Sequence, residues 1–109
     1  MSIKGDIVQD ENFNKGYVAG LIVGEGCFSG DALNPRLSIK QRENILPLKA
    51  CQDLLGGRIN GPYKYGIRAY DVWSLDGQAL KSSIEIISKI LPNSKKLEQF
   101  LKWQEKYML

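Results

Sequence analysis

The chain has 109 residues, two cysteines and no histidine, and its 15 Lys and Arg against 12 Asp and Glu give a net charge of +3. This length predicts a single domain over residues 1–109, and the lack of histidine excludes Ser-His-Asp, Cys-His and His-metal catalytic sites. The mild basic excess does not by itself indicate a nucleic-acid partner. Two thiols are too few for a zinc site or a disulfide framework, which favours a reducing, intracellular compartment. The longest apolar run, residues 17–23, is too short to cross a bilayer, so we expect no membrane partner.

The first half of the chain is expected to form an arm, a helix, two strands and a second helix, over residues 1–12, 13–25, 27–31, 36–42 and 44–55. The arm is polar and lacks periodicity, and Asn12 is expected to cap the first helix. In the second strand aliphatic residues alternate with cationic ones, which predicts one apolar face and one basic face. The second helix tolerates Pro47 in its first turn and ends at Gly56-Gly57.

The second half of the chain is expected to form two further strands and two further helices. The strands cover residues 58–60 and about 68–74, and a turn at Gly61-Pro62 ends the first of them. Residues 63–65 are expected to form a turn, which is interpreted either as a contact to the phosphate backbone of a nucleic acid or equally well as an ordinary loop. Asp76 is expected to cap the third helix, and a fourth helix ends the chain.

The order of these elements predicts an α+β domain. Strands that pair locally between helices form an antiparallel sheet with the helices packed on one face. The other face is then free, and it carries the cations of the second strand. The parity of the fourth strand stays open: either Val72 is buried and Asp71 and Trp73 are exposed, or Arg68 and Tyr70 are exposed and Trp73 is buried.

Three glycines of the first helix, Gly16, Gly20 and Gly24, are spaced by four residues and therefore share one helix face. Each glycine costs about 1 kcal/mol relative to alanine inside a helix, so the face needs a compensating gain. Close approach of another backbone supplies such a gain, as small residues do between membrane helices. No other segment has a matching glycine face, which predicts the same helix of a second copy as partner across a two-fold axis. Close packing within the chain is the alternative.

Glu25 is expected at the C-terminus of this helix, where the dipole is negative and the last carbonyls lack helical partners. A carboxylate is unfavourable there unless a cation binds. With a carbonyl such as that of Gly24, it would offer hard oxygen ligands suited to Mg2+. Two-fold symmetry would bring two such sites side by side. The alternative is that Glu25 is an ordinary solvated acid.

Residues 18–26, which read Val-Ala-Gly-Leu-Ile-Val-Gly-Glu-Gly, and the following Cys27-Phe28 resemble the LAGLIDADG signature of homing endonucleases. Glu25 falls on the catalytic acid of that signature, and Val23 replaces its first acidic position. The element order is similar to the family's αββαββα core. A single motif per chain implies a homodimer. The resemblance implies a Mg2+-dependent, intron-encoded endonuclease that breaks both strands of a long, nearly palindromic DNA site.

The resemblance also implies roles for three further groups of residues. The family has a basic residue shortly after a proline that follows the third helix; the segment with Lys95 and Lys96 looks like this one, and Lys95 is preferred. It also has a polar residue that positions water near the end of the second strand, for which Gln41 is preferred over Arg42 and Asn44. In such a site a metal-activated water attacks the phosphorus, and Lys95 offsets the developing charge. The strands would form a DNA-binding saddle through Arg36, Ser38, Lys40, Arg42, Arg58, Asn60 and Arg68.

Two other functions are compatible with the sequence. A nucleic-acid-binding protein that does not cleave, such as a maturase or a transcription factor, would use the same scaffold, although the retained Glu25 argues against it. A structural interaction domain would need no nucleic acid. The remaining residues of note are interpreted as structural, with small buried thiols at Cys27 and Cys51 and a packing stripe at Phe100, Trp103 and Tyr107.

Overall fold

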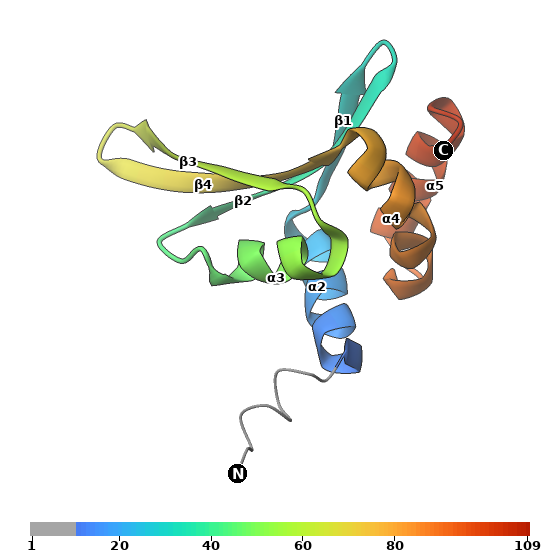
Figure 1. Ribbon diagram of the computed structural model, residues 1–109, viewed down its shortest axis with the longest axis horizontal. Helices are drawn as coiled ribbons and strands as arrows, with labels where there is room; N and C mark the ends of the chain where they lie inside the picture. Colours follow the sequence, from blue (N-terminus) through green and yellow to red (C-terminus); the bar gives the residue numbers. More distant parts are fainter. Residues whose placement is uncertain (1–10) are drawn as a thin grey trace.

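The computed structural model describes residues 11–109, which form four helices and four strands (Figure 1). The elements are α2 (Glu11–Glu25), β1 (Cys27–Asp31), β2 (Asn34–Arg42), α3 (Leu46–Leu55), β3 (Arg58–Tyr65), β4 (Arg68–Asp76), α4 (Gly77–Ile90) and α5 (Lys95–Lys106). This order confirms the α+β class. Most of the expected arm, residues 1–10, lies outside the described residues. None of the helices in the described part of the chain is long and apolar enough to span a membrane.

The four strands form one antiparallel sheet in the order β1-β2-β4-β3. The two central strands, β2 and β4, set Arg36 opposite Asp76 at one end and Arg42 opposite Tyr70 at the other. The helices lie on one side of this sheet, and the β3–β4 hairpin extends past them (Figure 1). The opposite face of the sheet is left uncovered by the described elements.

The core lies between the sheet and the helices. Leu37 and Ile39 enter it from β2, and Val18 and Ile22 enter it from α2, all four with at most 1% of their surface exposed. Burial of each such side chain contributes about 1.5–3 kcal/mol, which holds α2 against the sheet. The other fully buried side chains come from every remaining helix and from β4, namely Leu48, Cys51, Trp73, Leu75, Leu80, Ile87 and Phe100.

The fourth strand buries Trp73, which decides between the two parities that the sequence left open. The Trp73 indole N–H donates a hydrogen bond of 2.8 Å to the Gly56 carbonyl, so its polar atom is satisfied inside the core. Because side chains alternate along a strand, Arg68 and Tyr70 point to the uncovered face. β2 alternates as predicted, with Leu37 and Ile39 inside and its cations outside.

Several expected boundaries differ from those of the structure, and two of these differences change how residues are interpreted. α2 begins at Glu11, so Asn12 lies inside the helix and does not cap it. β3 does not end at Gly61-Pro62 but continues to Tyr65, because the ladder shifts its register by one residue between Asn60 and Tyr63 and so accommodates this pair. Since β3 is an edge strand, a proline there costs the sheet little. Residues 63–65 are therefore the end of β3 and belong to the β3–β4 hairpin.

Two expected side-chain roles are also wrong. Asp76 stands at the N-cap of α4, but its carboxylate makes no capping hydrogen bond and pairs instead with Arg58. Cys27 is exposed, because alternation along β1 directs it to the uncovered face opposite Ser38, whereas Cys51 is buried as expected. The aromatic stripe of α5 packs as expected, with Phe100 and Trp103 buried.

Candidate functional site

The C-terminus of α2 places Glu25 at the edge of the uncovered face. The next residue, Gly26, donates a backbone hydrogen bond of 2.9 Å to the Ile22 carbonyl and closes the helix. A Cβ at Gly26 would lie 2.6 Å from that same carbonyl oxygen, so only glycine permits this tight exit into β1. The Glu25-Gly26 pair therefore fixes an exposed carboxylate at the negative end of the helix.

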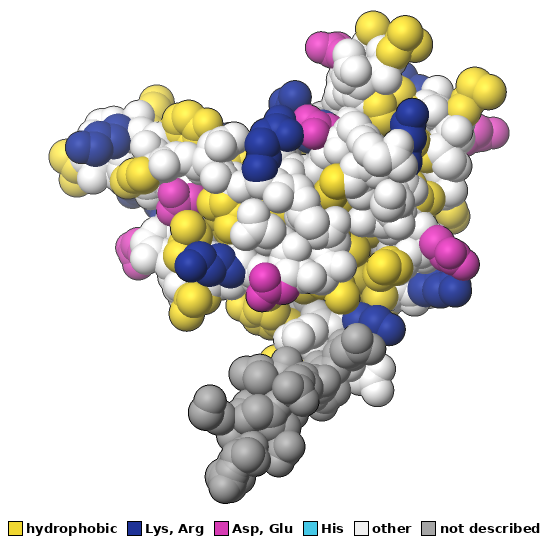
Figure 2. Space-filling model, in the orientation of Figure 1, with side chains coloured by type: hydrophobic (Ala, Val, Ile, Leu, Met, Phe, Trp, Pro, Cys, Tyr) yellow, Lys and Arg dark blue, Asp and Glu magenta, His cyan; other side chains and the backbone are white. Residues whose placement is uncertain are grey.

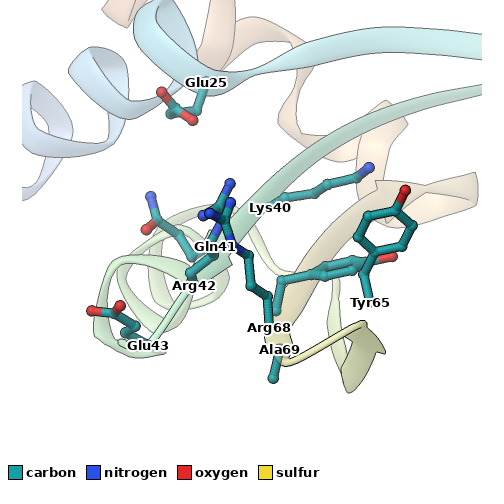
Figure 3. A pocket seen from close by; sticks show the side chains of 9 residues that line it. Glu25, Lys40, Gln41, Arg42, Glu43, Tyr65, Arg68 and Ala69 are labelled. Carbon is teal, nitrogen blue, oxygen red and sulfur yellow. The ribbon is translucent and has the colours of Figure 1, made fainter.

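Glu25 lines a groove together with the end of β2 and the start of β4 (Figure 3). The figure shows its carboxylate across open space from the ends of Arg42 and Arg68, whereas Lys40 points to the side. The groove brings together residues that are far apart in sequence and that were singled out for three different roles. Its lining is Glu25, Lys40, Gln41, Arg42, Glu43, Tyr65, Arg68, Ala69 and Tyr70.

Aromatic rings support the cations at this end of the sheet. The Lys40 ammonium lies 5.4 Å from the centroid of the Tyr70 ring, a cation–π distance. The Tyr63 ring lies 5.5 Å from Tyr70 across the β3–β4 pair. The rings hold the Lys40 charge above the sheet. From the sequence, Tyr63 belonged to a turn interpreted either as a phosphate contact or as an ordinary loop, and Tyr70 was not assigned a binding role.

At the other end of the sheet, two of the expected DNA contacts already share an acidic partner. Arg58 donates from Nη1 and Nη2 to the two carboxylate oxygens of Asp76, at 2.9 and 3.0 Å. Arg36 Nε lies 3.5 Å from Asp76 Oδ2. The hydrogen bonds from Arg58 hold the pKa of Asp76 below its ordinary value, and the same bonds raise the pKa of Arg58. Figure 2 shows acidic and basic side chains in contact near the junction of the sheet with α4.

The two lysines of α5 occupy different positions. The Lys96 ammonium donates a hydrogen bond of 2.8 Å to the Gly26 carbonyl oxygen, which brings it to the C-terminus of α2. Lys95, the preferred candidate, is exposed as the first residue of α5. Lys96 therefore ties α5 to the turn that follows Glu25.

One protomer offers few ligands for a metal ion. Among residues 11–109 no three acidic or thiol side chains gather into a metal-binding group. Mg2+ keeps several waters in proteins and is often held by one or two carboxylates, so a single Glu25 with the Gly24 carbonyl fits half of such a site. The donor set is therefore compatible with Mg2+ if a second copy supplies a second carboxylate.

The glycine face of α2 is open. Within residues 11–109, a Cβ placed on Gly16, Gly20 or Gly24 would meet no atom within 4 Å beyond the neighbouring backbone of α2. On the same helix the rings of Phe13 and Tyr17 are stacked, with 6.3 Å between their centroids. These two residues are 64% and 41% exposed. In the described chain these glycines serve no internal close packing, so that interpretation is wrong.

No protein-family model and no curated protein matches this sequence. Among solved structures, the chain is similar to the archaeal intron-encoded homing endonuclease I-Vdi141I, complexed with DNA, with 31% identity and a TM-score of 0.74 over 91% of this chain and 69% of that one. It shares the fold of the homing endonuclease I-TnaI, with 22% identity and a TM-score of 0.72 over 86% and 71% of the two chains. It also shares the fold of I-CvuI in complex with its target in the presence of calcium, with 17% identity and a TM-score of 0.68 over 90% and 68%. The likeness to I-Vdi141I over most of both chains, together with the single motif that ends in Glu25-Gly26, shows that this chain belongs to the LAGLIDADG homing endonuclease family and is of its single-motif type.

Proposed function

We propose that the chain is a homodimeric, Mg2+-dependent DNA endonuclease that makes a double-strand break at a long, nearly palindromic site. The observation that carries this proposal is the groove in which Glu25 faces Gln41 and the cations of β2 and β4. At the border of an uncovered sheet face, the cations would bind a DNA phosphate, and the neighbouring Glu25 carboxylate would bind the metal beside it. An intron-encoded homing role is proposed with it.

The open glycine face of α2 supports the presence of a second copy. Glycines without Cβ contacts cost helix stability unless another backbone packs on them. If α2 packs on its symmetry mate, the exposed rings of Phe13 and Tyr17 are covered as well, and apolar burial adds to the association. Because Glu25 follows Gly24 directly, the same two-fold axis would place two Glu25 side chains near each other.

The residues around Glu25 support metal-dependent hydrolysis of a phosphodiester. Glu25 and the Gly24 carbonyl would hold Mg2+, which when bound supplies a nucleophilic water and charge neutralisation at the phosphate. Gln41 lines the same groove and would orient that water through its amide. Lys95 would offset the charge that develops on the phosphate. Lys96 would keep α5 close to this site through its bond to Gly26.

The uncovered sheet face would hold the DNA. Its outward residues Arg36, Ser38, Lys40, Arg42, Arg58, Asn60 and Arg68 follow three adjacent strands. A two-stranded β element fits the major groove of B-DNA, where Arg and Lys can contact guanine edges or phosphates. The hairpin of β3 and β4 extends past the helices (Figure 1), so its tip would be free to enter the major groove of the DNA.

Selection of cleaved sites from a random library of palindromic DNA tests this function. With Mg2+ present, we expect recovery of a narrow set of related sites cut on both strands. Specific binding without cutting under any divalent metal would instead support a non-cleaving nucleic-acid-binding protein. Failure to bind DNA even at low ionic strength would contradict a nucleic-acid role altogether.

A further inference from the structure

Asp76 joins two arginines on the uncovered face. Its two oxygens accept hydrogen bonds from the end of the Arg58 guanidinium, and Oδ2 also lies close to Arg36 Nε. The acid is 27% exposed, whereas the arginines are 53% and 51% exposed. The carboxylate is therefore the inner member of the cluster, and the guanidinium groups are the parts that a ligand can reach.

The geometry leaves donors free on both arginines. A guanidinium carries five N–H groups. Asp76 occupies the edge of Arg58 formed by Nη1 and Nη2, so the edge that includes Nε remains available. On Arg36 the carboxylate lies beside Nε, so the Nη1–Nη2 fork remains available. Each arginine thus keeps one edge with two parallel donors. The two-point bond orients Arg58, and the single approach of Asp76 to Nε restrains Arg36 more loosely.

The charge of the cluster favours bases over phosphates. Two arginines and one aspartate sum to +1, and the carboxylate repels a phosphate brought close to either arginine. A guanine edge presents two neutral acceptors, O6 and N7, and a bidentate arginine is their commonest specific partner. Holding the side chain in place reduces the rotamer entropy that binding must otherwise overcome.

The position of the cluster points to the outer part of a half-site. Arg68, in the groove beside Glu25, and Asp76 are the first and last residues of the 9-residue strand β4. At about 3.4 Å per residue they are roughly 27 Å apart along the strand. B-DNA rises about 3.4 Å per base pair, so this length corresponds to about eight base pairs.

We infer that Asp76 is a positioning residue that holds Arg36 and Arg58 for guanine recognition, about eight base pairs outward from the base pairs that Arg68 contacts. The inference rests on the proposed function, because it assigns base readout to the same DNA-binding face. It adds an acidic residue to a surface on which only cations and small polar residues were expected to matter. A clamp that merely joined β3 to β4 would leave base preference unchanged when removed.

The test compares the base preferences of three proteins: the unaltered chain, Asp76→Asn and Arg58→Lys. The preferences are read from sites selected from the palindromic library. Affinity for these sites is then measured in competition with random-sequence DNA. We expect the unaltered chain to prefer guanine in the outer half-site. Asp76→Asn should lower this preference about tenfold while binding to random-sequence DNA stays equal or rises, because a negative charge is lost. Arg58→Lys should lower it similarly at unchanged charge, because lysine lacks the planar fork. Arg68→Lys should change preferences only at the inner positions.

Asp31→Asn is the matched control. Asp31 also lies on the uncovered face, but it accepts a hydrogen bond from Asn34 and is not among the ion pairs of the described residues. The Asp31→Asn variant should bind random-sequence DNA more tightly without changing the preference for guanine in the outer half-site. Guanine preference retained in Asp76→Asn overturns the positioning role, whatever the result for Arg58→Lys, while DNA cleavage stands. Failure of the unaltered chain to bind DNA specifically overturns the proposed function itself.

Discussion

Cys27 and Cys51 carry the same thiol in opposite surroundings. Burial on the inner face of α3 raises the pKa of Cys51 to about 12, which removes the reactive thiolate at neutral pH. Cys27 is exposed on the uncovered face, two residues after Glu25. The sequence predicted both thiols to be buried, because composition and local pattern do not say to which side a short strand turns its first residue.

A thiol reagent should therefore modify one cysteine in the native chain. We expect rapid labelling of Cys27, labelling of Cys51 only after unfolding, and slower labelling of Cys27 when the selected DNA is bound. Mass spectrometry of peptides measures both sites, and Cys27→Ser serves as the control for residual reaction. Equal rates at the two sites would contradict the burial, and a Cys27 rate unaffected by bound DNA would contradict its place on the binding face.

Asp76 makes a second prediction at the scale of a residue. Its pKa is lowered in the folded chain by Arg58, so the pairing stabilises the fold above the ordinary value of 3.8 and is lost as pH falls through the folded pKa. Because the pair is partly exposed, we expect Asp76→Asn to cost at most about 1 kcal/mol of unfolding free energy at pH 7.

Denaturant titrations at pH 7 and well below pH 3.8 measure this difference. The gap between the unaltered chain and Asp76→Asn should close at the acidic pH, since the carboxylate is then protonated in both states. A gap of equal size at both values would show that the charge of Asp76 is not its source.

At the scale of elements, helices and central strands follow from local pattern, whereas the edge strand does not. The periodicity of α4 and the alternation of β2 are properties of short sequence windows and predict these elements directly. β3 passes through Gly61-Pro62 because its ladder with β4 shifts there, and that pairing depends on residues farther along the chain. The pairing of Asp76 with Arg58 spans 18 residues and is equally invisible to a local pattern.

The candidate site shows the same division. The motif places Glu25 at the end of α2, because the signal and the helix are both local. The meeting of Glu25 with Gln41 and Arg68 in one groove needs the sheet order, which brings β4 beside β2. The bond from Lys96 to Gly26 joins residues 70 positions apart, and no sequence signal distinguishes Lys96 from Lys95 in this respect.

The glycine face of α2 yields a prediction for assembly. Gly20→Leu adds a side chain where a Cβ meets no other part of the described chain within 4 Å, so the protomer should fold normally. Between two closely packed helices the same side chain would force the backbones apart, so we expect a dimer to become a monomer. Sedimentation at micromolar concentration measures this change.

Ser82→Leu, on the exposed side of α4, adds a similar side chain away from the glycine face and should leave the dimer intact. If Gly20→Leu still sediments as a dimer, α2 is not the interface. An unaltered chain that is already a monomer without DNA would contradict a dimer held together by the glycine face of α2.

At the scale of the whole molecule, one protomer has an uncovered sheet face with the Glu25 carboxylate at its edge, and in the proposed function it supplies half of a metal site. Two copies would carry a charge of 2 × (+3) = +6, shared along one DNA-binding surface. The absence of histidine then suits a site made of carboxylates, carbonyls, lysine and metal. A surface of this kind binds DNA partly through phosphates and releases counterions.

Binding should therefore weaken as salt increases, with a linear dependence of log K on log salt concentration. Lys40→Gln removes a cation from each protomer, so we expect the slope to fall by about two per dimer if both lysines contact phosphates. Fluorescence anisotropy over a salt series measures the slope. Lys102→Gln on α5, on the helical side, should leave the slope unchanged, and an equal effect of both variants would contradict the assignment of the binding face.

The most direct test of the account is cleavage of the selected palindromic DNA by the unaltered chain and by Glu25→Gln, with Mg2+ and at matched DNA occupancy. Glu25→Gln keeps the shape of the side chain but removes the charged metal ligand, so we expect dimerisation and DNA binding to persist while cleavage slows by at least about 100-fold. Glu98→Gln, an exposed acid on α5, should cleave like the unaltered chain. Cleavage by Glu25→Gln at the unaltered rate would contradict the account.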